Sequence, residues 1–245
     1  MSEKKNVWIS GGSSEIAQSL IQLLNIQPDV SNIIVLSRNA VSINKEETGG
    51  ARIIPIQLDW LTEDAGKQLT GVVEQYPPHR VFCCNGILHD ESQMPEKNLK
   101  AMNLQWLHHS LDANVWPHIA LAQIVERSLT RQHDLRWISL SAMVGSISDN
   151  QLGGWYSYRM TKAALNMLIK NLSIEWQRKS PKTIAVAVHP GTTDTRLSEP
   201  FQKNIQPGKL YSADLTAQRM LNVMEHLTEE DNGKLLHWDG SVLPW

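Results

Sequence analysis

Tyr158 and Lys162 lie four residues apart in the segment 155–178, whose apolar pattern predicts a helix, so their side chains share one helix face. That face continues through Leu165 and Leu172 and is expected to pack on the protein body. A buried lysine costs free energy unless its charge has a partner or a purpose. A phenol beside an ammonium group has a lowered pKa and can act as a general acid. The alternative is a packed tyrosine beside a lysine that reaches solvent.

A glycine- and serine-rich turn, residues 10–17 with the sequence SGGSSEIA, follows the first apolar run at 7–9. Such a turn between a strand and a helix lets the backbone approach a pyrophosphate, which the helix N-terminus stabilises. The same composition also caps helices for purely structural reasons. The residues expected to contact a dinucleotide here are Gly11, Ser13, Ser14 and Ile16.

Arg38 follows the second apolar run, about twenty residues after the turn. Dinucleotide domains that prefer NAD usually carry an acidic residue at this point, whereas an arginine suits the 2′-phosphate of NADP. A solvated surface arginine is the alternative. The turn and Arg38 together favour NADPH as the cofactor.

Apolar runs alternate with helical patterns along the chain, which predicts an α/β fold. We expect one Rossmann-type doubly wound domain with a central parallel sheet of about seven strands and helices on both faces. Strands are predicted at 7–9, 33–36, 53–58, 81–84, 137–141, 184–188 and 235–238, and helices at 16–24, 99–129, 155–178 and 213–227. Pro55 suggests an edge strand, and Pro117 should kink or split its helix. The segment 190–212 is too long for a simple connector and is expected to form a lid.

The bulk composition is that of an ordinary globular protein: 245 residues, 41% hydrophobic and 20% charged. The whole chain, 1–245, is interpreted as one domain, with a dinucleotide-binding part at about 1–135 and a catalytic and substrate-loop part at about 136–245. A net charge of −2 gives no reason to expect nucleic acid or an anionic membrane as partner. No stretch approaches about 18 apolar residues, so a cytoplasmic protein is expected.

The cysteines and the paired histidines are expected to be structural. Cys83 and Cys84 are adjacent on a predicted strand, where they point to opposite faces and act as small apolar fillers. His108 and His109 are neighbours on a predicted helix and lack the spacing of metal ligands. The sequence therefore predicts no metal site.

Five landmarks in order resemble the short-chain dehydrogenase/reductase family over essentially the whole chain. They are Tyr158 with Lys162, the turn 10–17, Asn85-Gly86-Ile87 after the fourth strand, Asn114 in the following helix, and the segment 190–195 with Pro190 and Thr195. Within the family, residues 145–147, 153–159 and the closing GKLLHWDG look closest to the C-factor and sniffer-type carbonyl reductase branch.

The resemblance implies hydride transfer from NADPH to the carbonyl group of a small molecule. Tyr158 would donate the proton, Lys162 would hold the nicotinamide ribose and lower the Tyr158 pKa, and Asn114 would support a proton-relay water. Further cofactor contacts would come from Asp59 at the adenine, from Asn85, Gly86 and Pro190, from the backbone around Thr193 at the carboxamide, and from Thr195 at the nicotinamide half. The family also implies a homodimer or homotetramer formed through the long helices.

Glu15 and Ala17 stand where the family usually has glycines, which places an acid near the phosphate turn. The serine that orients the substrate carbonyl is also out of place. Counting back from Gly145 puts Ala142 at that position, whereas a one-residue bulge would bring Ser141 there. We name Ser141 as the catalytic serine, with Ser146 or no serine as the alternatives.

The remaining features describe the substrate and the competing function. Met143, Leu152, Trp155 and Phe201 suggest an apolar substrate pocket, although the same residues could serve packing or a subunit contact. The alternative to an enzyme is an NADP(H)-binding signalling or sensor protein with weak or no turnover, which Glu15 and the displaced serine favour.

Overall fold

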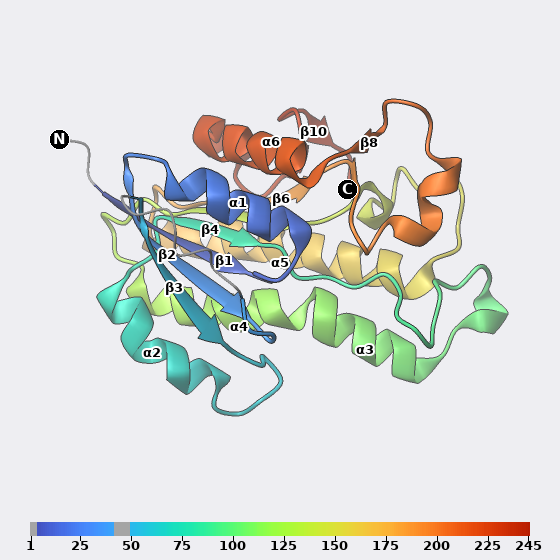
Figure 1. Ribbon diagram of the computed structural model, residues 1–245, viewed down its shortest axis with the longest axis horizontal. Helices are drawn as coiled ribbons and strands as arrows, with labels where there is room; N and C mark the ends of the chain where they lie inside the picture. The colour runs from blue at the N-terminus through green and yellow to red at the C-terminus, as the bar shows by residue number, and fades with distance from the viewer. Residues whose placement is uncertain (1–3, 42–49) are drawn as a thin grey trace.

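The computed structural model describes residues 4–41 and 50–245, and its centre is an eight-stranded sheet (Figure 1). The strands of this sheet are β1 (Lys5–Ser10), β2 (Val30–Ser37), β3 (Arg52–Gln57), β4 (Arg80–Cys83), β5 (Arg136–Leu140), β6 (Ile184–His189), β9 (Leu235–His237) and β10 (Val242–Leu243). The helices are α1 (Glu15–Asn25), α2 (Ala65–Gln75), α3 (Leu104–Asn114), α4 (Trp116–Val125), α5 (Tyr156–Lys179) and α6 (Ala213–His226). Short 3₁₀ turns occur at Leu99–Ala101, Glu126–Ser128, Met143–Gly145, Glu199–Asn204 and Glu229–Asp231.

The strand order is β10-β9-β6-β5-β4-β1-β2-β3, and every neighbouring pair is parallel except β9 with β10. The predicted α/β fold is thus confirmed, with seven parallel strands and one short antiparallel strand that the sequence pattern did not reveal. The order reverses between β1 and β4, and ligands of such sheets bind in the crevice outside the strands' carboxyl ends at this point.

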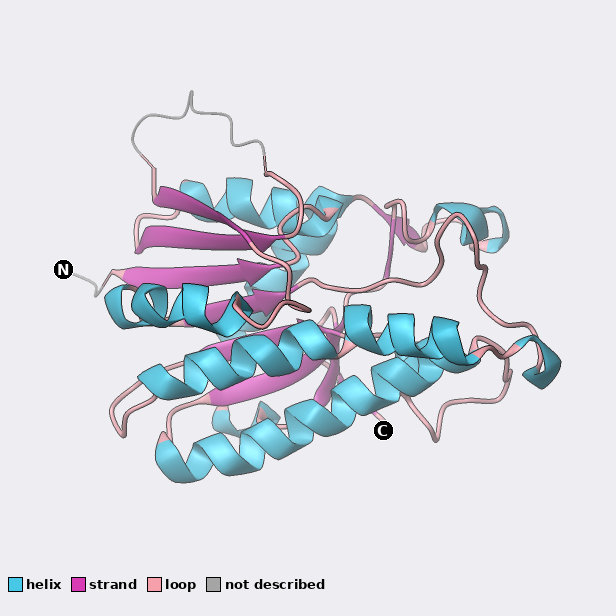
Figure 2. Ribbon diagram, turned by 90° about the horizontal axis from the view of Figure 1, so that it is seen from below, coloured by secondary structure: helices cyan, strands magenta, loops and turns pink. Residues whose placement is uncertain are grey.

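Alternation along the central strands divides the apolar core into two layers. Val7 and Ile9 on β1 pack with α1 and α6 on one face of the sheet. Trp8 between them packs with α2, α4 and α5 on the other face. Figure 2, viewed from below, shows this second helix layer lying over the sheet, roughly along the strands.

The prolines act largely as the sequence predicted. Pro55 lies on β3, which is an edge strand. An edge strand tolerates a residue without an N–H because one of its sides has no ladder partner. The predicted helix 99–129 is split: α3 ends at Asn114, Val115 leaves helical geometry, and Pro117 lies in the first turn of α4. The segment 190–212 carries its own two-stranded sheet, β7 (Thr192–Thr193) with β8 (Leu210–Tyr211).

Candidate active site

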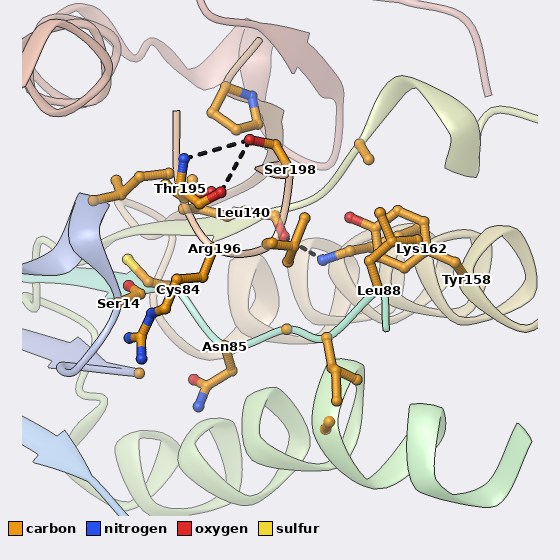
Figure 3. Close-up of a pocket in the computed structure, with 18 of the residues that line it drawn as sticks. Ser14, Cys84, Asn85, Leu88, Leu140, Tyr158, Lys162, Thr195, Arg196 and Ser198 are labelled. Carbon is orange, nitrogen blue, oxygen red and sulfur yellow. Dashed lines mark hydrogen bonds between the residues drawn. The ribbon is translucent and has the colours of Figure 1, made fainter. Parts of the chain in front are cut away.

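A cavity of about 630 Å³ opens at the carboxyl ends of β1, β4, β5 and β6, and is capped by the segment 190–201 (Figure 3). It is lined by all the predicted site residues except Asn114: Gly11, Ser13, Ser14, Ile16, Arg38, Asp59, Asn85, Gly86, Ser141, Tyr158, Lys162, Pro190, Thr193 and Thr195. The fold therefore brings together residues that are up to 184 positions apart in the chain, from Gly11 to Thr195.

Tyr158 and Lys162 extend from the first two turns of α5 into one end of this cavity (Figure 3). Their residues are 9% and 3% exposed, respectively. The Lys162 Nζ donates a hydrogen bond to the Leu140 carbonyl at the end of β5 (2.8 Å) and lies 5.6 Å from the centre of the Tyr158 ring. Gly145 packs against Lys162: a Cβ at Gly145 would lie 2.8 Å from the Lys162 Cβ.

Burial governs the protonation of both groups. It lowers the pKa of Lys162 to about 8 and raises the pKa of Tyr158 above its ordinary value. The expected lowering of the Tyr158 pKa by Lys162 is not seen in the protein alone, because desolvation dominates and the ammonium is directed at Leu140. Tyr158 therefore stays protonated at neutral pH, which is the form that can donate a proton.

Asn114 is fully buried beside the cavity and fixes its wall rather than lining it. Its Oδ1 accepts from the Ile87 N–H (2.6 Å), while its Nδ2 donates to the Ile87 carbonyl (3.0 Å) and to the Thr161 hydroxyl (2.9 Å). A Cβ at Gly86 would lie 3.3 Å from the Asn114 Oδ1 and 3.5 Å from the Lys162 Nζ. Asn114, Gly86 and Lys162 are thus in close approach, and a larger residue at 86 would crowd both polar groups.

The two candidate positions for the carbonyl-orienting serine differ sharply. The Ser141 hydroxyl donates to Oδ1 of Asn166 on α5 (2.7 Å), and the Asn166 amide donates to the Gly145 carbonyl (3.3 Å). Ala142 instead belongs to a small cluster with Leu88 and Tyr158. Ser141 lines the cavity, but its hydroxyl proton is used in a structural contact, and the position packed on Tyr158 belongs to Ala142. The catalytic role of Ser141 stays a prediction that no contact to Tyr158 supports.

Ser146 is no better placed as the alternative serine. It is buried, its hydroxyl accepts from the Asp149 N–H (3.2 Å), and it does not line the cavity. Of residues 141, 142 and 146, it is thus Ala142 that packs in one cluster with Tyr158.

Glu96 is a buried acid that the sequence reasoning missed. Its carboxylate accepts hydrogen bonds from the Ser157 N–H (3.2 Å) and the Ser157 hydroxyl, and its carbonyl accepts from the Trp155 N–H. Trp155 immediately precedes α5 and has a φ of 50°, in the left-handed region. The negative charge at the helix start is favourable and fixes the end of α5 that carries Tyr158. A buried acid in a long loop gives no periodic signal, so the sequence alone does not reveal this role.

The turn after β1 is shaped for close approach of a ligand. Gly11 has a φ of 78°, and a Cβ there would lie 2.8 Å from the Asn85 nitrogen. Ser14 is the N-cap of α1 and accepts from the Ala17 N–H (3.3 Å). In the described residues, the buried Ser37 Oγ and Asn85 Oδ1 have no hydrogen-bond partner, and both belong to residues that line the cavity. Unpaired buried polar atoms beside a glycine turn fit a bound dinucleotide.

Arg38 and Asp59 lie on the exposed side of this turn. Arg38 follows β2, its side chain is exposed, and its carbonyl accepts a hydrogen bond from the Gln57 amide (3.0 Å). The Asp59 Oδ1 accepts from the Leu61 N–H (3.0 Å). Both residues line the cavity.

The segment after β6 forms the roof of the cavity. The Thr193 hydroxyl pairs with that of Thr216 on α6 (2.8 Å), which anchors this cavity-lining residue to the body of the protein. The Thr193 carbonyl accepts from the hydroxyls of Thr195 (3.3 Å) and Ser198 (2.6 Å). These bonds hold the tip of the roof at Thr195 and Arg196 in a defined turn.

Arg196 links this roof to the phosphate turn, and the sequence reasoning did not single it out. Its Nε lies 3.0 Å from the Glu15 Oε1, its backbone N–H donates to the same oxygen (3.2 Å), and its Nη2 donates to the Ser13 carbonyl (3.5 Å). Burial raises the pKa of Glu15, but hydrogen bonds from its own backbone and from Arg196 outweigh this and leave the pKa below its ordinary value. Glu15 is therefore charged at neutral pH and paired across the cavity mouth.

The end of the cavity beyond Tyr158 is apolar and partly aromatic. The Trp155 ring lies 6.3 Å from the Tyr158 ring and 5.0 Å from that of Phe201, between centres. The other apolar residues that line this end are Leu88, Ala142, Met143, Val144 and Leu197. The prediction that Leu152 lines the substrate pocket is wrong, because this residue is exposed to solvent and does not line the cavity.

A family model described as short chain dehydrogenase matches residues 5–206. The chain belongs to this family. It is 31% identical to the C-signal protein of Myxococcus xanthus over 116 residues, which are 47% of this chain and 64% of that relative. The chain therefore spans less than two thirds of that relative's length.

Among solved structures, the carbonyl reductase Sniffer of Drosophila melanogaster superposes with a TM-score of 0.80 at 22% identity, covering 99% of this chain and all of that one. An NADPH-bound carbonyl reductase from chicken fatty liver gives a TM-score of 0.78 at 20% identity, covering 99% and 100%. These likenesses confirm the Rossmann-like fold. The expected resemblance to the C-factor and sniffer-type branch agrees with both kinds of relative.

Two properties hold for the part of the chain that the structure describes. Across 4–41 and 50–245, His, Cys, Asp and Glu side chains do not gather in any group of three or more that could hold a metal ion. In the same residues no helix has the length and apolarity needed to cross a membrane.

Proposed function

We propose that this protein is an NADPH-dependent reductase that converts the carbonyl group of a small apolar molecule to an alcohol. The observation that carries the proposal is the buried Tyr158–Lys162 pair. One cavity contains this pair, the glycine turn after β1 and the apolar residues packed around Tyr158. This arrangement supports hydride transfer from a cofactor held at the glycine turn to a carbonyl group held beside Tyr158.

The cofactor, when bound, supplies the hydride. Tyr158 holds the substrate carbonyl oxygen by its hydroxyl and donates the proton that completes the alcohol; its raised pKa keeps that proton in place at neutral pH. Lys162, with a pKa of about 8, carries a positive charge at pH 7 that stabilises the phenolate left after transfer. Asn114 keeps the Gly86–Ile87 backbone and the start of α5 in register with that pair.

Glycine-turn residues, Asn85, Pro190, Thr193 and Thr195 are proposed to hold the cofactor, with Arg38 at the 2′-phosphate and Asp59 at the adenine. Support for NADPH over NADH comes from the arginine after β2, where NAD-binding domains carry an acid. The unpaired Ser37 Oγ and Asn85 Oδ1 are the atoms that a bound dinucleotide would satisfy.

An apolar, uncharged carbonyl compound is proposed as substrate. Around Tyr158 the cavity offers Leu88, Val144, Trp155 and Phe201, and a charged group there would lose hydration without a partner. Planar or aromatic substrates would stack on the indole and phenyl rings.

A homodimer or homotetramer remains our expectation for the assembly. Large apolar side chains are exposed on α3 and α5, which lie in the long helical segments through which the resemblance implies association: Leu104 and Leu111 on α3, and Met160, Met167 and Ile174 on α5. Light scattering coupled to size-exclusion chromatography measures the assembly directly.

The proposal is tested by following NADPH absorbance while apolar aldehydes, diketones and quinones are added, with the alcohol product identified by mass spectrometry. Tyr158→Phe should reduce kcat by roughly a hundredfold to ten-thousandfold while NADPH binding changes little, because only the transferable proton is lost. A Tyr158→Phe variant with more than a tenth of wild-type turnover would remove Tyr158 as the acid. Wild-type protein that binds NADPH but reduces none of the compounds would favour the sensor function instead.

A further inference from the structure

Two unusual residues face each other across the cavity mouth. Glu15 is the first residue of α1, where the family usually has glycine, and Arg196 follows Thr195 in the roof. They meet in an ion pair of 3.0 Å, supported by a second hydrogen bond of 3.2 Å from the Arg196 backbone. The Arg196 side chain extends away from Tyr158 toward Ser14 and the phosphate turn (Figure 3).

The Glu15 carboxylate lies at the helix start where a cofactor diphosphate would bind. The start of α1 carries partial positive charge, which suits an anion. Glu15 fills that place with a carboxylate of the protein's own, and a dinucleotide diphosphate brought to the same turn would meet like charge. A cation in reach of both anions removes this conflict, and Arg196 is the arginine that the structure places there.

Arg196 also has the freedom that such a role needs. Its side chain is 80% exposed, whereas its backbone is anchored through its own N–H to Glu15 and through its carbonyl, 3.2 Å from the His89 Nε2. An exposed ion pair in water is weak, so exchanging one anionic partner for another costs little. A diphosphate offers more charge than one carboxylate and can bind the guanidinium in a bidentate fashion.

We propose that Arg196 is a ligand of the cofactor diphosphate, held in readiness by Glu15, and that the pair couples the position of the roof to cofactor binding. This inference rests on the proposed NADPH-dependent function. In the protein alone, Arg196 neutralises Glu15; with NADPH bound, its guanidinium turns to the diphosphate while the Arg196 backbone N–H still contacts Glu15. Glu15 thus holds the Arg196 backbone in place, and the roof closes on the cofactor from that position.

The test measures equilibrium dissociation constants of NADPH and NADH by fluorescence titration or calorimetry, with no turnover involved. Arg196→Ala should weaken binding of both cofactors about tenfold or more, and by the same factor, because the diphosphate is common to both. The weakening should be greater at low ionic strength than at high. Glu15→Gln should tighten binding of both, because it frees Arg196 and removes the competing charge.

The double variant Glu15→Gln/Arg196→Ala separates direct contact from simple neutralisation. If Arg196 contacts the diphosphate, the double variant binds NADPH about tenfold more weakly than Glu15→Gln alone. If Arg196 only cancels the charge of Glu15, the double variant binds as well as Glu15→Gln, and the proposal is overturned. A loss confined to NADPH would assign Arg196 to the 2′-phosphate and would overturn it as well.

A matched control is the exposed pair Lys67 and Asp64, 2.9 Å apart at the start of α2 and outside the cavity. Lys67→Ala removes the same charge from a side chain that is as exposed as Arg196 (80% for both) and should leave both dissociation constants unchanged. Thermal midpoints of all variants without cofactor check that they fold. Wild-type protein that binds neither cofactor would refute the proposed function, whereas wild-type binding that Arg196→Ala does not alter refutes only this role of Arg196.

Discussion

At the end of the cavity beside Tyr158, the polar side chains are buried and hydrogen-bonded to neighbouring elements. At the mouth, the side chains of Arg38 and Arg196 are exposed and that of Glu15 is half-buried. Lys162 is bonded to β5, Asn114 to Ile87 and Thr161, and Ser141 to Asn166. Glu15, Arg38 and Arg196 lie at element ends or in the roof. A reacting bond needs groups placed within a fraction of an ångström, which packed elements provide. A long, charged cofactor must enter and leave the site, and side chains that can change partners allow this.

This contrast predicts its largest effect at Lys162. Lys162→Met keeps most of the volume but removes the ammonium, so kcat should fall roughly a hundredfold or more, with a smaller loss of NADPH affinity. The thermal midpoint should change little, because losing one hydrogen bond to Leu140 is offset by removing a buried charge. The measurements are steady-state kcat, NADPH titration and thermal unfolding. Turnover within tenfold of wild type would show that the buried end is structural and not catalytic.

The strands, the helices and the glycine turn after β1 were predictable because each depends on the local sequence pattern. Alternating apolar runs follow from the two-sided sheet, and Gly11 is needed because a side chain there would meet the Asn85 backbone. The antiparallel β10 escaped because two residues, Val242 and Leu243, give no measurable periodicity. The lowered pKa expected for Tyr158 was wrong because spacing on a helix says nothing of how deeply the pair is buried.

The sequence did not predict residues whose roles depend on contacts between distant parts of the chain. Glu96 caps α5 from a loop some sixty positions away, and Arg196 reaches Glu15 across 181 positions. One signal was available: an acid replacing a phosphate-turn glycine requires a nearby cation, but the chain offers many and only the fold selects Arg196. The side-chain direction of Ser141 depends on whether the chain bulges after β5, which no local pattern decides.

The second prediction concerns that serine and sharpens the comparison within the buried end. Ser141→Ala should change kcat by less than about threefold but lower the thermal midpoint, because the buried Asn166 loses its donor. Ala142→Ser should raise kcat severalfold for weakly electrophilic ketones and less for activated diketones, because it adds a donor next to Tyr158. Both are measured at saturating NADPH. A tenfold loss in Ser141→Ala with unchanged stability would instead make Ser141 the orienting group.

The smallest effect is expected at the mouth, where Arg38 is proposed to meet the 2′-phosphate. Arg38→Ala should lower the ratio of kcat/KM for NADPH over NADH roughly tenfold, since an exposed charge-assisted contact is weaker than a buried one. The change should lie in KM for NADPH with kcat preserved, because Arg38 is remote from Tyr158 and holds ground state and transition state alike.

Arg38 and Arg196 together separate the two phosphate positions of one cofactor. Loss of NADPH affinity alone in Arg38→Ala, beside equal losses for NADPH and NADH in Arg196→Ala, would place one arginine at each end of the adenosine. Equal NADPH/NADH ratios in wild type and Arg38→Ala would assign the 2′-phosphate to another group. A fall in kcat in Arg38→Ala would break the comparison itself, because it would mean that the exposed mouth controls the geometry at Tyr158.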